Sequence, residues 1–248
     1  MLWEQAYAHS AMRSSFLATL AFLLLFGRSQ ADDSMDSERV RDALHDMEMT
    51  STWYHDDLFG EYAGFQHYAQ KQYKDALHYF ELGAYYADKP SQISIGLMYL
   101  KGEGVAADPV TALAWLDLAA ERGYPMYVAT RDRIRATLTA DQRTSAVEVR
   151  ERLAERYADA VAKPRLAEEL RAGLRQKTGS RTGFDTGVRI LFVDGDPQHW
   201  GPPSPLDMRT ACPRGFWSDE CWKPELYFAM RDKQLSATVK VGPVEEQK

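Results

Sequence analysis

The chain has 248 residues, of which 45% are apolar and 27% charged, with 16 glycines and 11 prolines. This balance is typical of a globular protein and excludes a disordered, collagen-like or membrane-embedded chain. Two cysteines are too few for a disulfide-dense scaffold or a four-thiolate zinc site. The net charge of −6 argues against a nucleic-acid binder, which needs a cationic surface.

The N-terminal region has the features of a secretory signal peptide. Residues 16–26 are apolar and uncharged, Arg13 precedes them, and Ser29 to Ala31 provides a small-residue exit. The apolar run is shorter than the roughly 20 residues that span a membrane. We expect translation to start at Met12 and cleavage to follow Ala31, which predicts a periplasmic or secreted protein without a stable membrane span. An uncleaved N-terminal anchor is the alternative.

The segment after the expected cleavage site is strongly acidic. Residues 32–58 contain nine carboxylates and two arginines, whereas the rest of the mature chain is close to neutral. The spacing of Val40, Leu44 and Met47 predicts an amphipathic helix over residues 36–49 with its acidic face in water. We interpret residues 32–58 as this helix and a linker, and an acidic arm that binds a partner is the alternative.

An internal repeat follows, with an offset of 36 residues. Ala76 and Leu77 correspond to Ala112 and Leu113, and within each copy small and bulky residues alternate every four positions. This spacing predicts helices that approach one another closely. Asp108 and Pro109 form a start signal for a helix. Gly102 and Gly104 are placed to end the preceding one. The pattern thus predicts a helical hairpin over residues 91–101 and 109–122.

These residues carry a family resemblance. The run from Ile95 to Tyr99, the Gly-Glu-Gly-Val turn at residues 102–105 and the positions Asp108, Ala112 and Trp115 resemble a Sel-one-like repeat. The hairpin at residues 59–86 is similar to the related tetratricopeptide repeat. The resemblance implies a mainly α-helical solenoid over residues 59–163 that acts as a scaffold for protein–protein contacts, with no enzymatic activity. Residues 125–138 and a capping box at Thr139 to Gln142 predict a further helical pair that closes the stack.

A solenoid of this kind binds through its concave surface, which the first helix of each hairpin should line. This places six candidate binding residues near the groove: Tyr62, Phe65, Gln66, Ser94, Met98 and Lys101. Some of them are expected to belong to the core. His45, His55, His67 and His78 lack the spacing of a metal site, so we expect no metal and no cofactor.

The C-terminal region, residues 164–248, changes in character. We expect a helix over residues 165–176, a hinge at 178–183, β-strands over residues 188–193 and 237–241, and a short helix at 224–232, which together predict a small strand-containing appendage. Cys212 and Cys221 lie in this region. In an exported chain two such cysteines are expected to form a disulfide bond.

The favoured function is therefore an exported helical-repeat scaffold for a protein or peptide partner, without catalysis. One alternative is an envelope glycan-binding module that uses Trp53, Trp200 and Trp217. Another is an enzyme with an unrecognised site in the C-terminal region. Against the enzyme, the sequence contains no Gly-x-Ser-x-Gly motif, no Ser-x-x-Lys motif and no Cys/His pair in a recognisable setting.

Overall fold

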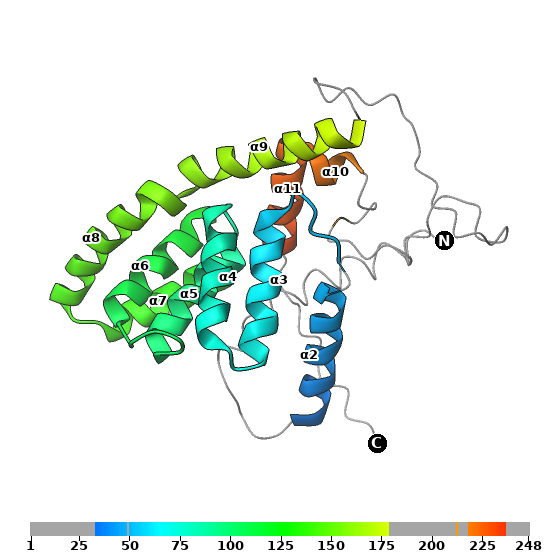
Figure 1. Ribbon diagram of the computed structural model, residues 1–248. Helices are drawn as coiled ribbons and strands as arrows, with labels where there is room; N and C mark the ends of the chain where they lie inside the picture. The colour runs from blue at the N-terminus through cyan, green and yellow to red at the C-terminus, as the bar shows by residue number, and fades with distance from the viewer. Residues whose placement is uncertain (1–32, 49, 179–211, 213–217, 237–248) are drawn as a thin grey trace, which may run out of the picture.

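The computed structural model describes residues 33–48, 50–178, 212 and 218–236, and these residues are mainly helical, with no strand among them. Figure 1 shows the helices gathered around α3 to α6, with α8 and α9 forming a long bent arm along one side. The predicted signal peptide, the predicted hinge at 178–183 and both expected strands lie wholly or almost wholly outside the described residues. No helix in the described part combines the length and apolar character that crossing a membrane requires.

Two helical pairs form the centre of the fold. Helix α3 (Asp56–Ala69) packs on α4 (Tyr73–Tyr85), and α5 (Lys89–Lys101) packs on α6 (Pro109–Ala119). Helices α4 and α5 join the pairs side by side. Small residues allow the first pair to approach closely, since a Cβ atom on Gly60 would lie 2.6 Å from the Gly83 Cα. The expected hairpin at 91–101 and 109–122 is therefore present as α5 and α6, followed by the 3-10 turn η1 (Ala120–Arg122).

The turn between α5 and α6 confirms the local signals in the sequence. Gly102 and Gly104 have φ angles of 75° and 74°, in the left-handed region that favours glycine. The Asp108 carboxylate caps α6 by accepting from the backbone N–H groups of Val110 and Thr111 at 3.0 and 3.2 Å. The sequence thus sets both ends of this turn through short-range interactions.

The next two helices do not repeat this hairpin arrangement. Helix α7 (Pro125–Thr137) and helix α8 (Ala140–Tyr157) both pack on α6 rather than chiefly on each other. The predicted capping box is present: Thr139 and Gln142 exchange hydrogen bonds at 2.9 and 3.2 Å. Helix α8 also contacts α4, so it lies across the second helices of both pairs.

Helix α9 (Asp159–Thr178) extends the arm and begins earlier than the sequence predicts, because Pro164 lies inside it instead of opening it. It contacts α3, α10 (Asp219–Trp222) and α11 (Pro224–Ser236). The short C-terminal helix expected at 224–232 is present as α11 and is one turn longer. The arm therefore joins the far end of the helical stack to the C-terminal helices.

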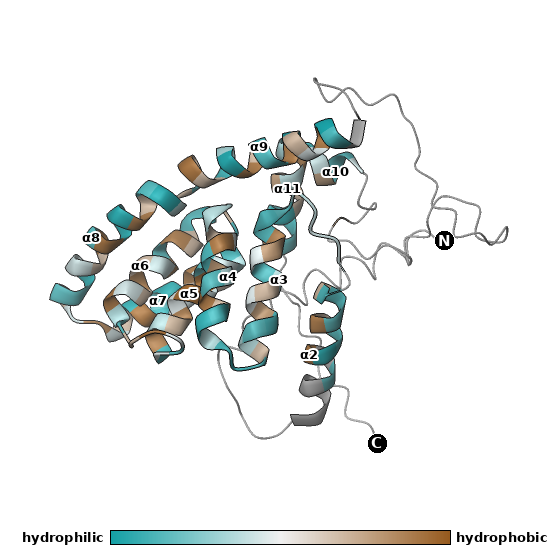
Figure 2. Cartoon of the chain, in the orientation of Figure 1, coloured by the Kyte–Doolittle hydropathy of each residue, from teal (hydrophilic) through white to brown (hydrophobic). Residues whose placement is uncertain are grey.

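Helix α2 (Asp33–Glu48) confirms the amphipathic helix expected over residues 36–49, and it packs beside α3 (Figure 1). Met47 is buried and Val40 and Leu44 are half-buried. Figure 2 shows the apolar residues of α2 on the side toward α3.

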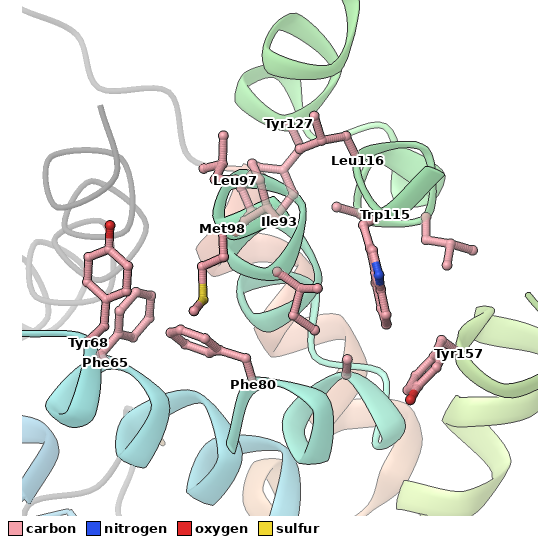
Figure 3. Close-up of a cluster of buried hydrophobic side chains, with 14 of the residues drawn as sticks. Phe65, Tyr68, Phe80, Ile93, Leu97, Met98, Trp115, Leu116, Tyr127 and Tyr157 are labelled. Carbon is pink, nitrogen blue, oxygen red and sulfur yellow. The ribbon is translucent and has the colours of Figure 1, made fainter. Parts of the chain in front are cut away.

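One continuous core runs through the helical pairs. Figure 3 shows Phe65, Phe80 and Met98 converging between α3, α4 and α5. The Phe65 and Phe80 rings meet edge to face with centroids 5.1 Å apart. At the other side of the core, Trp115 of α6 packs on Tyr157 at the end of α8 with centroids 4.7 Å apart. An edge-to-face ring contact stabilises a fold by about 0.5–1.5 kcal/mol more than the burial of its apolar area does alone.

Replacing Ala112 by tryptophan is expected to destabilise the α5–α6 pair. Ala112 is fully buried, and its carbonyl oxygen lies 3.1 Å from the position that a Cβ atom on Gly96 would take. Overpacking of such a contact costs about 1–3 kcal/mol, and an indole is larger than the usual test case. Urea denaturation measures the effect. The exposed Ala106→Ser is the control, and equal stability of the two variants would contradict the close α5–α6 contact.

Candidate functional site

The structure buries most of the six residues predicted to line a binding groove. Tyr62, Phe65, Ser94 and Met98 are buried in the core. The Ser94 hydroxyl donates to the Pro90 carbonyl within α5 at 2.7 Å. These four residues are therefore packing residues in this structure, because no solvent-facing surface is left for a partner to contact. Gln66 and Lys101 are the two candidate binding residues that keep exposed surface.

Gln66 is half-buried and lies where α2 meets α3. Its side-chain amide donates to the backbone carbonyl of Leu44 at 2.5 Å. Helix α2 thus covers part of the α3 surface that the sequence assigned to a partner. This cover could not be read from the repeat pattern, because α2 precedes the repeat.

Lys101 is exposed at the end of α5, beside a small polar cluster. The Tyr68 hydroxyl donates to the Glu103 carboxylate at 2.6 Å, and Lys101 Nζ lies 3.4 Å from the same hydroxyl. Burial and the Glu103 carboxylate raise the pKa of Tyr68 above its ordinary value. This cluster joins the C-terminal ends of α3 and α5 and leaves about a third of the Lys101 side chain exposed, 32%.

A buried charged cluster lies at the opposite ends of these helices, where α11 crosses them. The Arg231 guanidinium donates to Glu61 at 2.6 Å and to Asp88 at 3.0 Å. One turn earlier on α11, the Tyr227 hydroxyl donates to Asp57 at 2.6 Å. Helix α11 is therefore anchored to the first two turns of α3 and to the N-cap of α5 by side chains that are all buried.

The cluster contains more carboxylates than its one guanidinium can neutralise. Burial, reinforced by the neighbouring Asp88, raises the pKa of Glu61 to about 8 despite the attraction of Arg231. Burial also raises the pKa of Asp57, although His55 and Arg231 oppose the shift. Burial therefore favours the neutral form of Glu61 and Asp57 more than it would be favoured in water.

A second charged cluster fixes α9 and α11 to the turn after α6. Lys89 is fully buried and pairs with Glu121 at 2.9 Å and with Asp159 at 3.0 Å. Arg122 binds Asp159 at 2.6 Å and Asp232 of α11 at 3.3 Å. Burial would raise the pKa of Asp159, but the hydrogen bonds and charges of Arg122 and Lys89 outweigh it and hold that pKa below its ordinary value.

The predicted disulfide joins Cys212 and Cys221, whose Cα atoms lie 5.8 Å apart. His55 packs against this bridge, with Nε2 2.9 Å from the Cys221 carbonyl and Nδ1 2.9 Å from the Trp53 carbonyl. The ligand atoms of His55 and the two cysteines lie within 4.8 Å of one another. With both sulfur atoms in the disulfide, the group lacks the thiolates that a zinc site uses.

An exposed aromatic group lies on the outer face of α3 and α4. His67 stacks on Tyr79 with ring centroids 4.9 Å apart, and Phe59 meets Tyr79 edge to face at 5.7 Å. Phe59 keeps 41% of its surface exposed. Trp53, a residue of the glycan-binding alternative, is 43% exposed. Trp200 and Trp217 lie outside the described residues.

No family model, curated protein or solved structure matches this chain.

Proposed function

We propose that this chain is an exported helical-repeat scaffold of the Sel-one-like type, which binds a protein or peptide partner and catalyses no reaction. The paired packing of α3 with α4 and of α5 with α6 supports the repeat assignment. The glycine turn and the Asp108 cap between α5 and α6 lie where the resemblance requires them. The Cys212–Cys221 disulfide is compatible with export to an oxidising compartment.

The observation that carries the proposal is how the helical pairs hold other helices of the chain. Helix α11 is bound through Arg231, which meets α3 and α5 together, and α2 is bound along α3. An amphipathic helix binds to a surface of this kind by packing its apolar face against it. A surface that accepts two helices from outside the repeat is suited to accept a partner segment as well.

The test is affinity capture with the full mature chain from an envelope extract, followed by a measured Kd for the captured protein. Lys101→Ala removes an exposed candidate contact and is expected to weaken binding by more than about 1 kcal/mol, a factor of five or more. Lys233→Ala, exposed on α11, is the matched control and should bind normally. If the Lys101 variant binds the captured protein normally, the C-terminal end of α5 is not part of the contact surface.

The exposed Trp53 favours a second candidate, the envelope glycan-binding module. Indole rings exposed on a surface are suited to stacking on sugar rings. The same mature chain is to be titrated with soluble peptidoglycan fragments, and Trp53→Ala compared with the original chain. Saturable binding that this substitution abolishes would favour the glycan-binding function over the scaffold function. A turnover measured in substrate panels would instead favour an enzyme.

A further inference from the structure

The group formed by His55, Cys212 and Cys221 has the composition and the compactness of a metal-binding site. One possible donor atom from each residue lies within 4.8 Å of the other two. All three residues are buried. Two cysteine sulfurs and one imidazole nitrogen are the protein ligands of a Cys2His zinc site. Spacing along the sequence could not reveal this set, because 166 residues separate His55 from Cys221.

His55 is held in an orientation that suits a metal ligand. It is the N-cap residue of α3, and its Nδ1 lies 2.9 Å from the Trp53 carbonyl, which can accept the single N–H of a neutral imidazole. Histidines that bind metals commonly donate from their other ring nitrogen to a carbonyl in this way. Nε2 then carries the lone pair that a metal ion uses. This nitrogen lies on the side of Cys221, 2.9 Å from the carbonyl oxygen of that residue.

The surroundings of the group suit a complex without net charge. The rings of Trp222 and Tyr227 contact the His55 ring with centroids 5.1 and 5.2 Å away, and both belong to the second core of the molecule. A bare ion is costly in such a place, whereas Zn²⁺ with two thiolates and a neutral imidazole is neutral overall. Tetrahedral zinc with Zn–S bonds of about 2.3 Å holds its sulfur atoms about 3.8 Å apart. Binding therefore requires a small separation of two sulfur atoms that the fold already brings together.

We propose that reduction of the Cys212–Cys221 disulfide converts this group into a zinc site, in which Nε2 of His55 and the two thiolates bind the ion and a fourth position stays open. A dithiol reductant supplies two electrons and two protons and becomes a disulfide itself, which leaves two thiols in the chain. Each thiol releases its proton as zinc binds. The disulfide and the metal are thus alternative links between the start of α3 and α10. This inference goes beyond the proposed scaffold function and does not depend on it.

The experiment is a zinc titration of the full mature chain after reduction by a phosphine, which takes an oxygen atom from water as the disulfide opens. A chromophoric chelator reports the free ion. The reduced chain is expected to bind one zinc ion, and the oxidised chain, which is the matched control, to bind about tenfold more weakly or not at all. His55→Ala in the reduced chain should weaken binding by about tenfold or more, since even the loss of a residue that only orients a ligand costs about 10–100-fold. His67→Ala, whose ring stacks on Tyr79 elsewhere, should bind normally.

Cobalt in place of zinc adds a readout that a purely structural role would not give. Thiolate ligands produce a sulfur-to-cobalt charge-transfer band, and His55→Ala should alter the visible bands that report the geometry of the ion. If His55→Ala does not fold in its oxidised form, His55→Asn replaces it, because its amide can still donate to the Trp53 carbonyl.

Reduction that unfolds the chain still gives a decisive result. The free energy of metal binding then contributes to folding, so zinc should restore the helical circular dichroism signal. A reduced chain that binds no zinc, equal Kd values for the original chain and the His55 variant, or helices that zinc does not restore would each overturn the inference.

Discussion

Replacing Arg231 by methionine is expected to lower the free energy of unfolding by about 3–5 kcal/mol, the usual cost of leaving a buried charge without its partner. The guanidinium is almost fully buried and donates to Glu61 at 2.6 Å and to Asp88 at 3.0 Å. Methionine has a similar length but no donor, so Asp88 loses its charged partner and the Glu61 carboxyl group loses its hydrogen-bond donor. The free energy is measured by urea denaturation with the disulfide intact.

The control is Arg133→Met on the exposed face of α7, which should change stability by less than about 0.5 kcal/mol. Adding Glu61→Gln to the Arg231 variant should recover part of the loss, because it replaces an ionisable carboxyl group that has lost its donor by a neutral amide. A double-mutant cycle then isolates the coupling between the two side chains. If Arg231→Met were as mild as the control, α11 would not depend on this cluster for its position.

Short-range signals were the predictable part of this fold. Asp108 followed by Pro109, the capping box at Thr139 and the glycine at 102 each act through neighbours within a few residues, and each is present as expected. The amphipathic α2 was predictable for the same reason. The disulfide was predictable from the number of cysteines and the expected export, since two cysteines in an exported chain usually pair.

The binding surface was less predictable, because helical spacing identifies a face without identifying what covers it. Tyr62, Phe65, Ser94 and Met98 do share the first helices of their pairs, as the repeat implied. Their burial depends on contacts with other elements, and residues far along the chain cannot be paired by periodicity. The start of α9 at Asp159 has a similar cause, since Arg122 of η1 and Lys89 of α5 form ion pairs with that residue.

The buried charged cluster could not be predicted from the sequence, because a carboxylate that folding buries looks the same in sequence as one that stays in water. Asp57 and Glu61 stand four residues apart, on one face of α3, which is a signal that could have been noted. Their partner Arg231 lies 170 residues beyond Glu61. Asp88 is recognisable as the N-cap of α5, but its second role as a ligand of Arg231 depends on tertiary contact.

Raising the pH from about 5 to 8 is expected to lower the stability of the folded chain through Glu61. In the folded state the pKa of Glu61 is raised from 4.5 to about 8, chiefly by burial, while in the unfolded chain it stays near its ordinary value. Between these values the folded state holds a proton that the unfolded chain has lost, so stability is greatest at the acidic end and falls as pH rises. One proton gives a limiting slope of about 1.4 kcal/mol per pH unit.

Glu61→Gln keeps the size and hydrogen-bonding capacity of the side chain but cannot ionise, so its stability profile should lack this slope. Asp57, whose pKa is also raised, leaves its own contribution of the same sign in the variant. Glu151→Gln, exposed on α8, should retain the original profile. The measurement is the free energy of unfolding in urea at pH 5, 6, 7 and 8 for the three chains. Parallel profiles for the original chain and Glu61→Gln would mean that Glu61 remains ionised beside Arg231 throughout this range, and that the guanidinium outweighs both burial and Asp88.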